Sequence, residues 1–86
     1  MNENEKRALL AQTVALTQFA ASSARDALRL SDDRASWALA DALYWAARAA
    51  AQAAHRLGDE NSADFANEVA DDLVSLAESA GHVIRR

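Results

Sequence analysis

The sequence predicts an all-α protein, a bundle of three long alanine-rich helices, and three observations support this fold class. The 86 residues contain no proline and only two glycines, so helix-breaking residues are rare. Hydrophobic residues make up 51% of the chain, and alanine, the best helix former, supplies 23 of them. The larger apolar residues recur every three or four positions, which is the period of one helix face. We expect a single domain spanning residues 1–86.

Short polar segments divide the chain into helices. The Ser-Asp-Asp segment at residues 31–33 separates two apolar runs and can cap a helix N-terminus. Gly58 favours the left-handed backbone that ends a helix, and Asp59, Asn61 and Ser62 can each cap the next helix. Gly81 marks another helix end. The predicted helices span residues 3–30, 33–57 and 60–80, and a short tail follows over residues 81–86.

The first two predicted helices each carry two apolar stripes. The stripes on the first helix begin at Leu9 and Leu10, and those on the second begin at Trp37 and Leu39. A helix that is apolar on two sides is usually buried on two sides, and three helices cannot readily cover every stripe. We therefore predict that the chain assembles into a larger bundle, most simply a two-fold dimer; the alternative is a tight monomer with exposed alanine faces. The interface residues we predict are Leu10, Val14, Ala47, Ala51 and Ala54.

Charge is distributed unevenly along the chain. The net charge is −4 at pH 7, and residues 57–84 hold seven acidic residues and no Lys or Arg. This balance argues against direct binding to nucleic acid, because neutralising phosphates requires clustered Lys and Arg. A row of carboxylates can instead dock on the basic surface of a protein partner. The contact residues that we predict on the third helix are Asp64, Glu68, Asp71, Asp72 and Glu78.

A second candidate contact lies on the middle helix. Asp41, Trp45, Arg48, Gln52 and His55 follow one another at steps of three and four residues, so they share one face. Trp and Arg are enriched at the energetic centres of protein interfaces. We predict Trp45 and Arg48 as partner-binding residues; the alternative is an ordinary solvent face with one amphipathic Trp.

A different class of function, an enzyme or phosphotransfer module, would be centred on His55. Arg48 and His55 have six residues between them, a spacing similar to the Arg-x(4–6)-His motif of the small helical ribonucleases of the HEPN family. This resemblance implies that the Arg and the His act on an RNA phosphate, although Ala49 stands where those enzymes tend to carry a polar residue. Residues 54–58 also resemble the segment around the phosphorylated His of histidine-phosphotransfer domains, but the Lys of that motif is missing.

Several other classes are not supported by the residues present. The chain has no cysteine, which excludes disulfides and thiolate chemistry. It has neither the Glu-x-x-His pair of diiron bundles nor an EF-hand loop, so we predict no metal and no cofactor. Its acidic N-terminus is unlike a signal peptide, and residues 8–24 are too polar to cross a membrane. We expect a cytoplasmic, non-catalytic protein that acts by protein–protein association, as an inhibitor, antitoxin, immunity protein, phage antagonist or assembly subunit.

Overall fold

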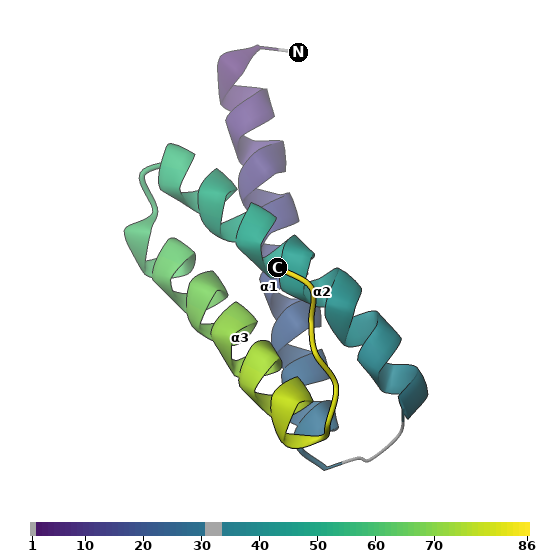
Figure 1. Ribbon diagram of the computed structural model, residues 1–86. Helices are drawn as coiled ribbons and strands as arrows, with labels where there is room; N and C mark the ends of the chain where they lie inside the picture. Colours follow the sequence, from purple (N-terminus) through teal and green to yellow (C-terminus); the bar gives the residue numbers. More distant parts are fainter. Residues whose placement is uncertain (1, 31–33) are drawn as a thin grey trace.

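Three helices, packed side by side, form the protein (Figure 1). The computed structural model describes residues 2–30 and 34–86, and within these ranges it contains no strand. The predicted three-helix bundle is therefore confirmed, and the helix ends fall close to the predicted ones; the predicted cap at residues 31–33 lies outside the described residues. The helices are α1 (Glu3–Arg29), α2 (Arg34–Arg56) and α3 (Glu60–Ser79).

Side-chain caps fix the N-termini of α1 and α3. The Asn2 side chain accepts a hydrogen bond of 2.8 Å from the backbone N–H of Glu5. The Asp59 carboxylate accepts one of 3.1 Å from the backbone N–H of Ser62. Each cap satisfies a donor that has no partner inside its helix. The sequence had suggested Asp59 for this role.

Two glycines end α2 and α3 by the same backbone device. Gly58 and Gly81 have φ angles of +79° and +83°, the left-handed region that favours glycine. After each glycine the chain donates a hydrogen bond back into the helix: Asp59 N–H to the carbonyl of Ala54 at 2.9 Å, and His82 N–H to that of Ala77 at 2.8 Å. This pattern is the Schellman motif, which pairs the last free carbonyls of a helix.

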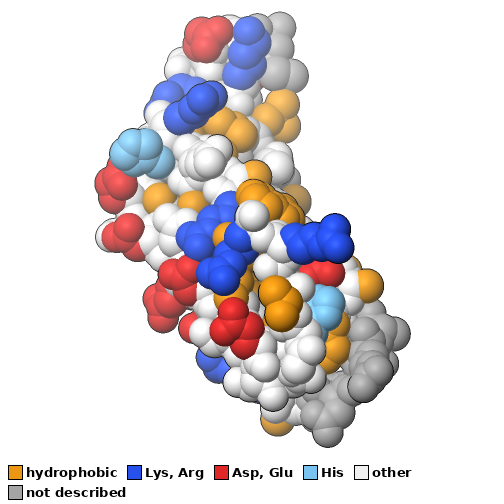
Figure 2. Space-filling view, in the orientation of Figure 1, with side chains coloured by type: hydrophobic (Ala, Val, Ile, Leu, Met, Phe, Trp, Pro, Cys, Tyr) orange, Lys and Arg blue, Asp and Glu red, His pale blue; other side chains and the backbone are white. Residues whose placement is uncertain are grey.

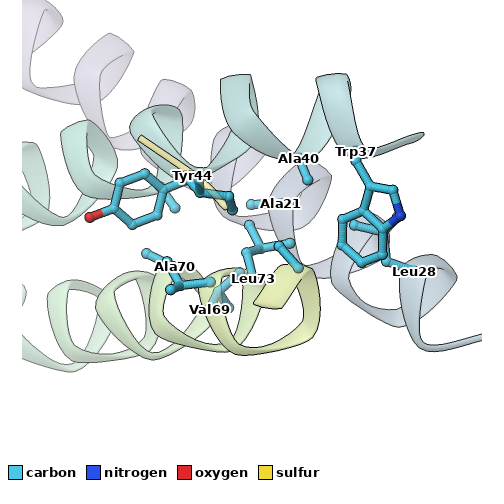
Figure 3. Packing of buried hydrophobic residues seen from close by; sticks show 12 residues of the cluster. Ala21, Leu28, Trp37, Ala40, Tyr44, Val69, Ala70 and Leu73 are labelled. Carbon is cyan, nitrogen blue, oxygen red and sulfur yellow. The ribbon is translucent and has the colours of Figure 1, made fainter. Parts of the chain in front are cut away.

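Alanine dominates the interior. Leu73 and Val69 of α3 are the largest fully buried side chains, and Leu73 lies near Ala21 of α1 and Ala40 of α2 (Figure 3). Trp37 supplies aromatic bulk at one end of this cluster. Small side chains allow helix axes to approach closely, so backbone and Cβ atoms make the dispersion contacts that bulky side chains make elsewhere. The buried alanines are Ala21, Ala40, Ala47, Ala50, Ala51, Ala54, Ala63, Ala66, Ala70 and Ala77.

The chain reverses after Gly81 and runs back over α2 and α3 (Figure 1). Ile84, in this returning segment, is only 2% exposed and belongs to the main core cluster. The predicted tail over residues 81–86 is thus part of the packed structure. The sequence did not predict that this tail contacts the core, because a single buried residue outside a helix leaves no periodic pattern.

The N-terminal part of α1 projects beyond the turn that joins α2 to α3 (Figure 1). Residues 2–13 are all exposed. Near this end, the Arg7 guanidinium donates a hydrogen bond of 3.1 Å to the carbonyl of Leu57, at the end of α2. The exposed residues include Leu9 and Leu10, so a substantial part of the apolar surface of α1 is not covered by α2 or α3.

Candidate functional site

Part of the predicted acidic face of α3 is paired with arginines of the other helices. The Arg25 Nη1 and Arg29 Nη2 atoms of α1 lie 3.2 and 3.5 Å from Asp72 Oδ2. The Arg48 Nη2 atom of α2 lies 2.6 Å from Asp71 Oδ1. Red and blue side chains accordingly lie close together over α2 and α3 (Figure 2). Two of the predicted contact residues, Asp71 and Asp72, are therefore paired with arginines of the same chain.

Arg48 is the centre of a polar cluster between α2 and α3. Its guanidinium donates to the Tyr44 hydroxyl at 3.2 Å, to Asn67 Oδ1 at 2.7 Å and to Asp71 Oδ1 at 2.6 Å. It also lies 5.2 Å from the centre of the Tyr44 ring. The hydrogen bond to Tyr44, followed by that to Asp71, raises the pKa of Arg48 above its ordinary value. Arg48 was predicted as a binding residue, but its donors are directed at partners within the chain.

The other three predicted carboxylates also lie at the surface. Asp64 and Glu68 are exposed, and within residues 2–30 and 34–86 neither takes part in an ion pair. Glu78 lies 3.7 Å from the guanidinium of Arg86. Asp64 and Glu68 are one helical turn apart, so they form a small negative patch near the N-terminus of α3.

Trp45 lies on the outer side of α2 next to the returning segment. Its side chain is half-exposed, and its indole N–H donates to the carbonyl of Arg85 at 3.1 Å. Its ring meets the Tyr44 ring edge-on, with 5.2 Å between centroids. The indole thus combines an intramolecular hydrogen bond with an exposed apolar surface, which is compatible with the binding role predicted for it.

A shallow cavity of about 400 Å³ lies between the C-terminal half of α2 and the start of α3. Arg48 and His55 both line it, so the structure brings together the two residues of the Arg–His motif. His55 Nδ1 lies 2.6 Å from Glu60 Oε1, across the turn between the helices. Arg48 and His55 are therefore each paired with other residues of the chain. Asp64 also lines the cavity.

A second, apolar groove of about 310 Å³ lies between α1 and α2. All eight residues that line it belong to these two helices, among them Leu10, Thr13, Ala46 and Ala49. Helical spacing places the second apolar stripes of α1 and α2 beside this groove, on the side remote from α3. We call this surface the α1–α2 apolar face; it comprises the groove and the exposed residues of these stripes outside it, Leu9, Leu16, Phe19, Ala20, Ala27, Leu30, Leu39 and Ala42.

The predicted interface residues lie mainly inside the protomer. Val14, Ala47, Ala51 and Ala54 are buried by the chain's own helices, so they are core residues and no surface remains on them for a second copy. Leu10 alone of the predicted set is partly exposed, at the groove. Periodicity identified two stripes on each helix, and the stripe chosen for the interface is the one that faces the core.

Comparison of the chain with protein-family models, with curated proteins and with solved structures found no match. No helix in the described part of the chain is both long enough and apolar enough to cross a membrane. Among residues 2–30 and 34–86, no three His, Cys, Asp or Glu side chains are grouped as metal ligands would be.

Proposed function

We propose that this protein is a non-catalytic association module, of the inhibitor or assembly-subunit type, that binds another protein chain through the α1–α2 apolar face. The observation that carries the proposal is the exposure of large apolar side chains on this face: Leu16 is 64% exposed and Phe19 74%. Residues 8–24 of α1 and 49–54 of α2 contain no charged residue. Extended uncharged apolar patches mark interaction sites on soluble proteins.

The helical form of the face favours a helical partner. Four of the eight residues that line its groove are alanines of α2, and an amphipathic helix can lay its apolar side into such a groove. Alanine walls admit a close approach of the partner backbone. The proposed ligand is therefore an apolar helix face, and the contact is driven mainly by burial of apolar surface.

The exposed carboxylates Asp64 and Glu68 are a proposed second contact for a partner with a basic surface. Asp71 and Asp72 are left out of this contact, because their reversal to Lys would also break the pairs with Arg48 and Arg25. The double variant Asp64→Lys with Glu68→Lys tests the contact without touching those pairs. Unchanged partner capture at low salt would remove the acidic patch from the proposal.

The second candidate function, chemistry centred on His55, is favoured by one observation, the shared cavity of Arg48 and His55. His55→Ala would abolish such an activity and leave association intact. Gln52→Ala, which changes another residue lining the same cavity, is the matched control.

The proposed function is tested by site-specific photo-cross-linking in the cells that make the protein. A photoreactive phenylalanine analogue replaces Phe19 on the α1–α2 apolar face or, as a matched control, the exposed Phe65 of α3. We expect a discrete protein adduct from position 19 and none from position 65. Mass spectrometry then identifies the partner, which can be a different protein or another copy of this chain. Equal diffuse labelling from both positions would contradict the proposal.

A further inference from the structure

We infer that the occupant of the α1–α2 apolar face is a second copy of this chain, paired through antiparallel α1 helices about a two-fold axis. This inference rests on the proposed function and deepens it by naming the partner. Two observations support it independently: the area of the face, and the order of large and small residues along α1.

The exposed apolar area matches what a dimer needs. Five large side chains of the face, Leu9, Leu16, Phe19, Leu30 and Leu39, are between 48% and 91% exposed. A fully exposed Phe contributes roughly 200 Å² and a Leu somewhat less, so together these residues present on the order of 600 Å² per copy. Complete coverage of these residues in both copies would bury about 1,200 Å², the lower end of the range for specific interfaces.

The spacing of residues on α1 is that of a coiled-coil seam. Leu9, Leu16, Ser23 and Leu30 follow at intervals of seven residues, and all are exposed. Thr13, Ala20 and Ala27, also seven apart and exposed, lie on the neighbouring row of the same face. Two rows of mainly large apolar or small residues with a seven-residue repeat, here interrupted by Ser23 and Thr13, are typical of helices that pack side by side. Such a seam on the outside of a protomer implies a helix outside the protomer.

The seam complements itself when one copy is reversed. In the antiparallel dimer, a two-fold axis passes near residue 18 of both α1 helices. It places Leu16 opposite the partner's Ala20 and Leu9 opposite the partner's Ala27, and the symmetry repeats each contact with the two copies exchanged. Large side chains then meet small ones, as close packing of two helices requires. In-register parallel pairing would instead place each Leu opposite its own copy and each Ala opposite its own copy, leaving gaps at the alanines.

The antiparallel arrangement also covers the projecting end of α1. Residues 2–13 are all exposed: Arg7 reaches the carbonyl of Leu57, and Leu10 and Thr13 line the groove beside α2, but the opposite side of this segment faces solvent. In the dimer, the Leu9 end of one α1 lies along the Ala27 end of the other. These turns therefore gain a second neighbour on the side that α2 does not cover.

Cysteine cross-linking tests both the contact and its direction, because the native chain has no cysteine. A mixture of Leu16→Cys and Ala20→Cys chains is expected to form a disulfide-linked heterodimer at least tenfold faster than either variant alone. A mixture of Leu9→Cys and Ala27→Cys chains repeats the test at the predicted contact between Leu9 and Ala27. Ala11→Cys, exposed on the side of α1 opposite the seam, is the matched control. Faster self-cross-linking of the single variants would indicate parallel pairing and overturn the inference.

Solution mass provides the second measurement. Light scattering of the unmodified protein is expected to give twice the 9.2 kDa mass of the chain, and Leu16→Glu is expected to give the monomer mass with unchanged helicity. Val83→Glu, at a similarly exposed position off the face, should leave the dimer intact. A monomer at 100 µM, a concentration on the order of a weak dimer's Kd, would overturn the inference. If the protein were monomeric but position 19 still cross-linked to a different protein, the proposed function would stand and only the dimer would be excluded.

Discussion

Trp45 of α2 donates its indole N–H to the backbone carbonyl of Arg85 across 3.1 Å. This bond fixes the returning C-terminal segment beside α2, directly after the buried Ile84. Earlier in the segment, His82 Nε2 lies 2.9 Å from Asp41 Oδ1, and the His82 ring stacks on Trp37 with 6.1 Å between centroids. Polar contacts therefore hold the segment on both sides of its one buried side chain.

Ile84→Ala should lower the free energy of unfolding by about 2–4 kcal/mol, because it removes buried methyl groups and leaves a cavity in the main core cluster. Urea unfolding followed by circular dichroism measures this loss. Val83→Ala, at the exposed neighbouring position, should change the stability by less than about 0.5 kcal/mol. Equal effects of the two variants would mean that the segment does not insert into the core.

Arg48→Gln should lower the free energy of unfolding by about 1 kcal/mol. The variant removes charged hydrogen bonds between α2 and α3, but the pair with Asp71 is partly exposed, so solvent screening reduces its contribution. Arg56→Gln, nearby at the exposed end of α2, is the control and should be nearly neutral. A loss in Arg48→Gln no larger than in Arg56→Gln would show that the cluster does not stabilise the bundle.

Acid should weaken the start of α3 through Asp59. Hydrogen bonds from Ser62 lower the pKa of Asp59 below its ordinary value. The stabilisation is therefore complete above the unfolded pKa and is lost as the pH falls through the lower folded pKa. As the pH falls below about 4, the ordinary pKa of Asp, the melting temperature of the native protein should fall more steeply than that of Asp59→Asn, which caps without a charge. Parallel melting curves would exclude this contribution.

Enlarging a buried alanine should be far more harmful than enlarging an exposed one. Ala47→Leu introduces a side chain where α2 has no free space, and overpacking of this kind costs about 1–3 kcal/mol. Ala42→Leu, on the exposed stripe of the same helix, should change the stability of the protomer by less than about 0.5 kcal/mol. Thermal unfolding of the two variants side by side measures the difference, and equal destabilisation would indicate looser packing around Ala47.

The helices could be predicted from the sequence because their signals are local. Gly58, Asp59 and Gly81 act within one turn of their own positions, and alanine favours the helix wherever it stands. The bundle followed from apolar spacing, which reports that a face is buried. Spacing does not report what buries it, and this is why Val14 and Ala47 were assigned to an interface although they lie in the core.

The candidate site depended more on tertiary structure. The acidic face of α3 is visible in the sequence, but the pairing of Asp72 with Arg25 joins positions 47 residues apart and has no local signature. The insertion of Ile84 is equally non-local. What periodicity did identify was the second stripe of α1, beginning at Leu9, and the structure leaves that stripe exposed.

The alanine-lined interior restricts how this protein can diverge over evolution. A core of bulky side chains can exchange Leu for Ile or Met, whereas a site between two closely packed backbones accepts little beyond Ala, Gly or Ser. Homologues should therefore keep small residues at positions such as 21, 40, 47, 66, 70 and 77 while their exterior changes freely. Small residues conserved at these buried positions, more than any shared large residue, would identify distant homologues.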